Sequence, residues 1–130
     1  MTDRPAPLHI APVVAVTDLD RARAFYEDQL GLDGSASAGG GWALAGDHGT
    51  VLNLLPDVPD AGTASWPVAT FRVDDVHAVV RELRGRGVPF LGDDNLPFDL
   101  DDDGVSVAQD GLSVAWMHDP DGSVLTIFSS

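Results

Sequence analysis

The chain of 130 residues contains no cysteine and no lysine, and its seven basic residues are all arginine. The lack of cysteine excludes a thiol nucleophile and a thiolate metal site, and the lack of lysine excludes a Schiff-base lysine. No apolar run approaches the ~20 residues of a transmembrane helix, and the first seven residues contain no apolar core of a signal peptide. We therefore expect a cytoplasmic protein.

Positive charge is also scarce. Seven basic residues stand against 21 acidic ones, which gives a formal net charge of -14. Such a surface repels the phosphates of nucleic acid and of an anionic membrane, so we expect neither as a partner. A cationic small molecule would be attracted, although the same charge also serves to keep a protein soluble.

An internal repeat divides the sequence into two similar halves. Val16–Ala22 aligns with Val73–Val79, and each segment follows a run that is typical of a strand. Each copy then opens a helix with an aspartate, Asp18 or Asp75, at the N-cap. There a carboxylate accepts hydrogen bonds from free backbone N–H groups. The repeat indicates that the two halves have the same order of elements.

Hydrophobic spacing and turn residues give the bounds of the expected elements. The first helix ends at Gly31, and the second ends around residues 85–87. Strands are expected at 13–16, 42–45, 50–55, 68–73, 89–91, 105–107, 112–117 and 123–128. We predict an α+β fold with two β-α-β-β-β modules, about 8–56 and 66–130, in a single domain of residues 1–130.

Two segments resemble a known family. They are the run Val13–Leu32, with sequence VVAVTDLDRARAFYEDQLGL, and the turn Asp119-Pro-Asp-Gly122. Together they resemble the vicinal oxygen chelate superfamily, which includes glyoxalase I, extradiol dioxygenases, fosfomycin-resistance enzymes and bleomycin-resistance proteins. The resemblance implies a cup-shaped incomplete barrel with the helices outside, completed in a homodimer. A monomer with both modules packed in cis is the alternative.

Most enzymes of that superfamily need a divalent metal. The resemblance gives the matching ligand positions by counting from the caps Asp18 and Asp75 and from Asp119, and by alignment through residues 51–54. These positions hold Ala11, Asn53, Val68 and Thr126. None of these side chains is a good ligand for a hard or borderline cation, which prefers imidazole or carboxylate. We therefore expect no metal and no other cofactor.

The histidines leave one alternative open. His9 shares a face with Ala11 if that stretch is a strand, and a displaced metal set could combine His9 with His118. One imidazole cannot hold a metal alone. His48 lies in a turn and His77 in the first turn of the second helix, so we expect both at the surface. We assign no catalytic residue.

Alternation along the strands predicts the lining of the cup. Val114, Trp116 and His118 share one face, and the resemblance to fosfomycin-resistance enzymes implies that the first two contact ligand. The alternative for Trp116 is a core position under a helix. Trp42 and Trp66 are expected at the rim of the cup. The predicted ligand-binding residues are Trp42, Asn53, Leu55, Trp66, Val68, Thr70, Phe98, Val114, Trp116, His118, Thr126 and Phe128.

An apolar, aromatic lining suits the binding of a flat or greasy molecule.

Pro12 matches a proline in the bleomycin-resistance proteins, where it lies at the hinge of a strand that exchanges between subunits. The resemblance implies that this chain, like them, binds a small molecule without metal. The Trp-Gly-Arg segment of the bleomycin-resistance proteins is absent here, and Gly111–Trp116 takes its place. The resemblance therefore does not identify the ligand.

We predict a metal-independent protein that sequesters an antibiotic or other natural product, aromatic or cationic, as a self-resistance device. A lyase, isomerase or dioxygenase of the same superfamily is the competing prediction. An accessory protein of a polyketide or peptide pathway is a third. The acidic segment 93–103 is either a lid over the ligand or a solvated loop.

Overall fold

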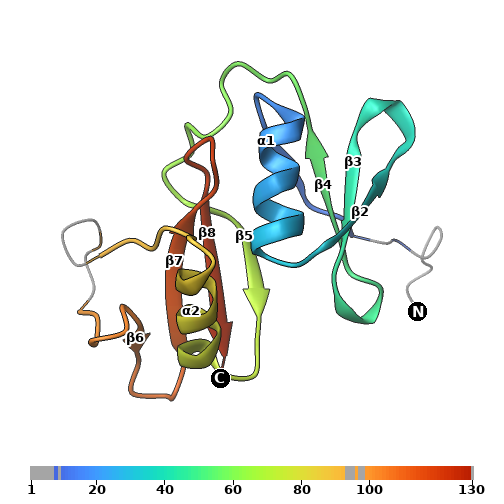
Figure 1. Ribbon diagram of the computed structural model, residues 1–130. Helices are drawn as coiled ribbons and strands as arrows, with labels where there is room; N and C mark the ends of the chain where they lie inside the picture. The colour runs from blue at the N-terminus through green and yellow to red at the C-terminus, as the bar shows by residue number, and fades with distance from the viewer. Residues whose placement is uncertain (1–7, 9, 93–95, 97–98, 130) are drawn as a thin grey trace, which may run out of the picture.

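The computed structural model describes residues 8, 10–92, 96 and 99–129. These residues form two four-stranded mixed sheets, each with a helical segment against one face, and the described strands close no barrel (Figure 1). This arrangement confirms the predicted α+β class. Some predicted residues lie outside the described part of the chain. They are residues 93–95 of the acidic segment, Phe98 of the predicted cup and His9 of the alternative metal set.

The first sheet has the order β1-β4-β3-β2. Strand β1 runs parallel to β4, and the other neighbours are antiparallel. Its elements in chain order are β1 (Val13–Ala15), α1 (Leu19–Arg23), η1 (Ala24–Gln29), β2 (Asp33–Ala36), η2 (Ala38–Gly40), β3 (Trp42–Ala45), η3 (Asp47–Gly49) and β4 (Val51–Leu55).

The second sheet repeats this order as β5-β8-β7-β6, again with one parallel pair, β5 and β8. Its elements are β5 (Pro67–Arg72), α2 (Val76–Gly85), β6 (Ser106–Val107), β7 (Ser113–His118) and β8 (Val124–Ser129). The repeat in the sequence therefore corresponds to a repeat in strand order.

Both helices begin at the predicted caps. A carboxylate oxygen of Asp18 accepts from the N–H of Arg21, and one of Asp75 accepts from the N–H of Ala78, each at 3.2 Å. The first helix then widens from α1 into the π-helical turn η1, where the N–H of Leu30 donates to the carbonyl of Phe25. The widening was not predicted, because apolar spacing and capping residues do not distinguish i→i+5 from i→i+4 bonding.

Two strands differ from the prediction. Strand β2 was not located, because its sequence Asp33-Gly-Ser-Ala36 has no apolar alternation, and pairing with β3 forms it. The strand expected at 89–91 is reduced to a bridge between Phe90 and Met117. Pro89 has no N–H to donate, which limits its place in a ladder.

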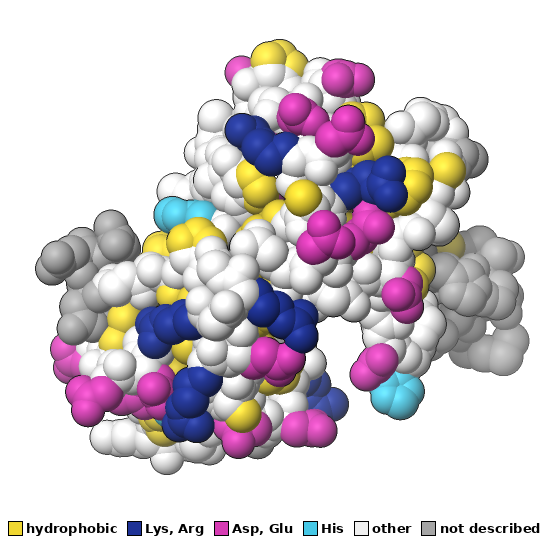
Figure 2. Space-filling view, in the orientation of Figure 1, with side chains coloured by type: hydrophobic (Ala, Val, Ile, Leu, Met, Phe, Trp, Pro, Cys, Tyr) yellow, Lys and Arg dark blue, Asp and Glu magenta, His cyan; other side chains and the backbone are white. Residues whose placement is uncertain are grey.

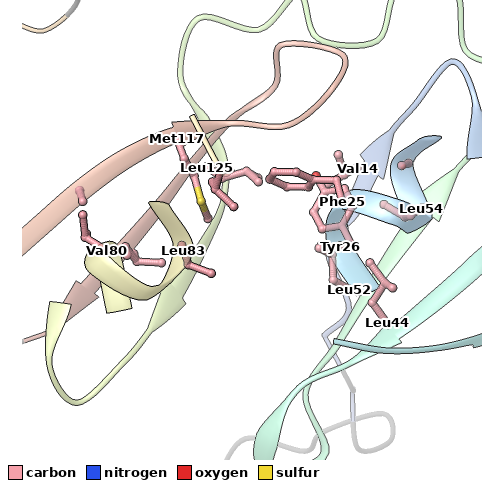
Figure 3. Close-up of a cluster of buried hydrophobic side chains, with 14 of the residues drawn as sticks. Val14, Phe25, Tyr26, Leu44, Leu52, Leu54, Val80, Leu83, Met117 and Leu125 are labelled. Atoms are coloured by element: carbon pink, nitrogen blue, oxygen red, sulfur yellow. The ribbon is translucent and has the colours of Figure 1, made fainter. Parts of the chain in front are cut away.

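One apolar core joins the two modules. Tyr26 is fully buried and meets Phe25 edge to face, with the ring centroids 5.0 Å apart. In Figure 3, Tyr26 lies near Leu52 of the first sheet, while Phe25 reaches toward Leu125 of the second. The first helical segment therefore contributes to the packing of both sheets.

A buried polar contact accompanies this packing. The Tyr26 hydroxyl donates to Oδ2 of Asp119 at 2.8 Å, and the N–H groups of Ser123 and Asp121 donate to Oδ1. Burial raises the pKa of the Asp119 carboxyl, and the hydrogen bonds from Tyr26 and the two N–H groups oppose that shift. The Asp-Pro-Asp-Gly turn is thus tied to the first helix.

The linker between the modules passes close to the same turn. Gly62 has a φ of +81°, and a Cβ there would lie 1.9 Å from the carbonyl oxygen of Asp121. A side chain at this position would therefore displace the linker or the turn. Thr17 and Arg21 also contact the Asp121 carboxylate, the latter at 2.8 Å.

Candidate functional site

Strand β7 has one buried and one open face. Ala115 and Met117 are fully buried in the core, and α2 packs against β7 and β8 on that side. Val114, Trp116 and His118 alternate with them and are only partly buried. The structure therefore places Trp116 on the face away from α2, as the cup prediction requires, and not in the core.

Register extends this open face across the second sheet. Trp116 lies opposite Thr126, which lies opposite Thr70, and Thr126 donates a hydrogen bond to the Thr70 hydroxyl at 2.6 Å. The next row joins Val114, Phe128 and Arg72. We call this surface the open face of the second sheet. It consists of Thr70, Arg72, Ser106, Val114, Trp116, His118, Val124, Thr126 and Phe128.

The first sheet has a corresponding open face with different side chains. On β1 and β4 it presents Val13, 58% exposed, and Leu55, 48% exposed, beside Asn53. The open face of the first sheet consists of Val13, Ala15, Asp33, Ser35, Ala43, Ala45, Val51, Asn53 and Leu55. Small and aliphatic residues predominate, and no aromatic side chain is among them.

The predicted ligand-binding residues are divided between these two surfaces. Asn53 and Leu55 lie on the first open face, and six others lie on the second. Trp116 is next to Thr126, as predicted, but Asn53 belongs to the other sheet. The six on the second open face are Thr70, Val114, Trp116, His118, Thr126 and Phe128.

Trp42 requires a correction. It pairs with Leu54 on the helix-covered face of the first sheet, where its indole N–H donates to Glu27 at 3.0 Å. The Arg23 guanidinium lies over its ring, 3.8 Å from the centroid. The prediction that Trp42 stands at the rim of the cup is therefore wrong. Its strand, Trp42-Ala-Leu-Ala45, has no polar alternation that would reveal which side faces the helix.

Two other predicted residues lie near the start of β5. Trp66 precedes the strand and is 64% exposed. Val68 stands at a register irregularity between Pro67 and Ala69 and is partly buried against the core. Together with Val13 and residues 60–64 it lines a shallow pocket of about 230 Å³. Pockets that bind drug-sized ligands measure ~300–1,000 Å³, so this pocket is too small to enclose one.

Arg72, Ser106 and Val124 lie on the second open face but were not predicted. Arg72 lies two positions after Thr70, so the two-residue alternation of the strand places both side chains on one face. The same alternation relates Val124 to Thr126, so the strand period contained the signal for both residues. Ser106 lies in a strand of only two residues, and its pairing with Val114 places it on this face.

The residues at the four ligand positions do not fit a metal. Asn53 and Thr126 offer one amide and one hydroxyl, they stand in different sheets, and Ala11 and Val68 offer no donor. Among the described residues, no group of three or more His, Cys, Asp or Glu side chains could hold a metal ion. His118 therefore belongs to no such group within that part of the chain.

Acidic and basic side chains alternate on the surface that carries the helices (Figure 2). Arg23 pairs with Glu27 at 2.7 Å, and this hydrogen bond lowers the pKa of the Glu27 carboxyl. His77 pairs with Asp101 at 2.7 Å, and Arg81 with Asp103 at 3.1 Å. His77 is therefore partly buried and paired, so the prediction of a free surface position was incomplete.

These two pairs hold the end of the acidic segment 93–103 against α2. Partial desolvation raises the pKa of Asp101, but hydrogen bonds from His77 and from the N–H groups of Val105 and Asp103 outweigh it and lower the pKa. Residues 101–105 thus lie beside α2, which covers the face opposite Trp116.

Comparison with solved structures gives close matches in fold. TnmS3, an antibiotic binding protein from Streptomyces sp. CB03234, has 28% identity and a TM-score of 0.67, with 95% of this chain and 97% of that chain covered. A glyoxalase/bleomycin resistance protein from the same Streptomyces has 27% identity and a TM-score of 0.64, with 92% and 97% covered.

A third structure, the glyoxalase/bleomycin resistance protein of Catenulispora acidiphila, has 22% identity and a TM-score of 0.70, with 95% of this chain and 99% of that chain covered. At this identity the likeness concerns the fold alone. No curated protein sequence matches the chain. Among the described residues, no helix is both long and apolar enough to cross a membrane.

A family model matches nearly the whole chain, residues 7–127. It covers both modules, both capped helices and the Asp-Pro-Asp-Gly turn. The chain belongs to the Glyoxalase/Bleomycin resistance protein/Dioxygenase superfamily.

Proposed function

We propose that this protein binds a small molecule without a metal and sequesters an antibiotic or other natural product. The observation that carries the proposal is the open face of the second sheet. There Trp116 and Phe128 lie in adjacent rows beside the Thr70–Thr126 hydroxyl pair. Aromatic surface with a few fixed polar groups is the usual composition of a small-molecule site. Sequestration needs burial and shape complementarity but no catalytic group.

Similarity to TnmS3 supports the same class of ligand. That protein is an antibiotic binding protein, and its 28% identity extends over nearly the whole of both chains. Fold alone would not transfer a function within this superfamily, because one fold hosts several chemistries. The aromatic open face is therefore the primary support, and the similarity is secondary.

The proposal of metal independence rests on the side chains at the four family ligand positions. The Ala11, Asn53, Val68 and Thr126 side chains provide neither imidazole nor carboxylate, and these are the ligands that family metals would need. A ligand in this site would be held by stacking, burial and hydrogen bonds. Each aromatic stack adds ~0.5–1.5 kcal/mol beyond the burial of area.

We also propose that the protein acts as a homodimer. Among the described residues, four of the six exposed large hydrophobic side chains, Leu8, Ile10, Val13 and Leu55, lie in or before the first sheet. Exposed apolar side chains that form a large patch mark an interaction site. A second copy would place one open face opposite another and enclose a cavity that one chain leaves open.

The arm before Pro12 fits this assembly. The Pro12 carbonyl accepts from the N–H of Asn53 at 2.9 Å, so the chain joins its own sheet from that residue onward. Leu8 and Ile10 are 83% and 92% exposed. The proposal assigns these two side chains to the surface of the second copy.

A thermal-shift screen of natural products against the purified protein tests the function, followed by tryptophan quenching with each hit. Trp116→Phe should remove most of the quenching, and the control Trp42→Phe should preserve it, because Trp42 lies on the helix-covered face. Elemental analysis after purification without chelator belongs to the same test. Stoichiometric metal together with turnover of a hit would favour the lyase, isomerase or dioxygenase reading.

A further inference from the structure

The charge pattern of the second open face differs from that of the whole molecule. The chain has 21 acidic residues, yet none of the nine described positions on this face is Asp or Glu. The charged or ionisable side chains there are Arg72 and His118. A ligand on this surface therefore meets a positively charged lining, although the protein as a whole has a formal net charge of -14.

Arg72 is also distinguished from the other described arginines. Arg21, Arg23, Arg81 and Arg86 each form an ion pair with a carboxylate. The Arg84 guanidinium lies over the Phe90 ring at 5.3 Å from its centroid.

Arg72 is an exposed residue at the end of β5, and its side chain has no ion pair, hydrogen bond or ring contact with any residue that the structure describes. The protein has three acidic residues for every basic one, yet among the described arginines Arg72 alone has neither a carboxylate nor an aromatic ring as a partner. Its charge is available to a group from outside the chain.

Its position places that charge at the edge of the aromatic surface. Arg72 is in register with Phe128, and Phe128 is in register with Val114. Neighbouring strands lie ~4.8 Å apart, and residues two apart on a strand lie ~6.7 Å apart. A flat ligand over Phe128 and Trp116 would therefore bring its edge within reach of the Arg72 guanidinium.

Resting on the proposed function, we propose that Arg72 recognises an acidic group on the ligand, so that the protein takes an aromatic molecule carrying a carboxylate or an ionised phenol or enol. A guanidinium matches a carboxylate with two parallel N–H···O bonds, which adds direction as well as charge. The Thr70–Thr126 hydroxyl pair in the next row supplies further polar contact.

The net negative charge of the protein does not oppose this assignment. Exposed charges are largely screened beyond a Debye length of ~8 Å at physiological ionic strength. A direct contact with a guanidinium acts at about 3 Å. The field of distant carboxylates thus affects the rate of approach more than the bound state, and the local charge decides which ligand stays.

Isothermal titration with two matched probes tests the proposal. Anthracene-2-carboxylate and anthracene-2-carboxamide share one ring system and differ in charge. Wild-type protein should bind the acid about ten- to hundredfold more tightly than the amide, which corresponds to a charge-assisted hydrogen bond of ~1.5–3 kcal/mol. Arg72→Gln should abolish that preference and leave the amide affinity within about twofold. Arg72→Lys should retain part of the preference.

The control is Arg81→Gln, which changes the net charge by the same amount on the helix side of the second module. It should preserve the full preference for the acid. Equal loss in both variants would mean a long-range effect of charge and would overturn the role of Arg72. Light scattering at the titration concentrations must give the same mass for both variants. A mass change confined to Arg72→Gln would assign the residue to an interface between copies instead.

The outcomes also separate this proposal from the one on which it rests. If wild-type protein binds the acid and the amide equally, and Arg72→Gln changes neither, acid recognition by Arg72 is refuted while small-molecule binding stands. If wild-type protein binds neither anthracene probe, and no natural product shifts its melting temperature, both proposals fail together.

Discussion

The two sheets have the same strand order, and each is accompanied by a helix that begins at an aspartate cap. Their open faces nevertheless present different side chains. The first presents mainly small and aliphatic side chains, such as Val13, Ala15 and Leu55. The second presents Trp116, Phe128 and Arg72. Aliphatic surface suits contact with another protein copy, and aromatic surface with fixed polar groups suits a ligand. Repetition of a module thus conserves its inner packing while leaving its outer face free to specialise.

The inner packing can be tested on adjacent residues of one strand. Leu54 is 1% exposed, and Leu55 is 48% exposed on the opposite face. Leu54→Ala should lower the free energy of unfolding by ~2–5 kcal/mol, because it removes buried methyl groups and leaves a cavity. Leu55→Ala should change the stability of the single chain by less than ~0.5 kcal/mol. Urea denaturation of both variants at low protein concentration measures the difference, and similar losses would refute the assignment of faces.

The second sheet offers a similar neighbouring pair. Trp116→Ala should weaken ligand binding by ~2 kcal/mol or more, because an aromatic side chain at the centre of a site is lost. Met117→Ala, at a fully buried position, should instead lower stability by ~2–5 kcal/mol and leave the affinity per folded molecule unchanged. Thermal melts with and without ligand separate the two effects. A large stability loss with unchanged affinity for Trp116→Ala would contradict its place in the site.

If the first open face is the dimer interface, a charged side chain introduced there should weaken the dimer. Leu55→Asp would place a carboxylate on a surface that a second copy should cover, and the dimer dissociation constant should rise tenfold or more, ~1.4 kcal/mol. The matched control is Asp20→Ala, on the exposed side of the first helix, which should leave the assembly intact. Analytical ultracentrifugation measures both. A wild-type protein that stays monomeric at micromolar concentration would refute the dimer.

The contact of Tyr26 with Asp119 between the modules should give the smallest effect, a dependence of the unfolding free energy on pH. Burial raises the pKa of Asp119 in the folded state, so the folded protein holds that proton more tightly than the unfolded chain. The resulting stabilisation is fully present below the unfolded pKa and is lost as the pH rises through the folded pKa. The difference in unfolding free energy, wild type minus Asp119→Asn, should therefore fall with increasing pH. A difference that grew with pH would contradict the raised pKa.

Local patterns in the sequence predicted much of each module. The caps at Asp18 and Asp75 are confirmed, because a carboxylate before an apolar stripe has a local role that does not depend on the rest of the fold. The alternation that grouped Val114, Trp116 and His118 also matches the structure. Both signals reflect the chain's own geometry and need no knowledge of distant residues.

The misses share a physical cause. Strand β2 has a sequence of low strand propensity and forms because β3 pairs with it. Trp42 was assigned to the wrong side, because Trp42-Ala-Leu-Ala45 is apolar on both faces and only the packing of Arg23 and Glu27 decides between them. The division of the predicted lining between two sheets depends on how the modules pack. Such choices are made by tertiary contacts, which a local pattern does not record.

The central claim is that the second open face binds a small molecule without metal and without converting it. The most direct measurement is calorimetric titration of a screening hit into protein before and after treatment with chelator, followed by mass spectrometry of the recovered ligand. We predict equal affinity in both titrations, and recovery of the ligand unchanged and in stoichiometric amount. Loss of binding after chelation, restored by added Fe, Mn, Ni or Zn, or recovery of a converted product, would contradict the account.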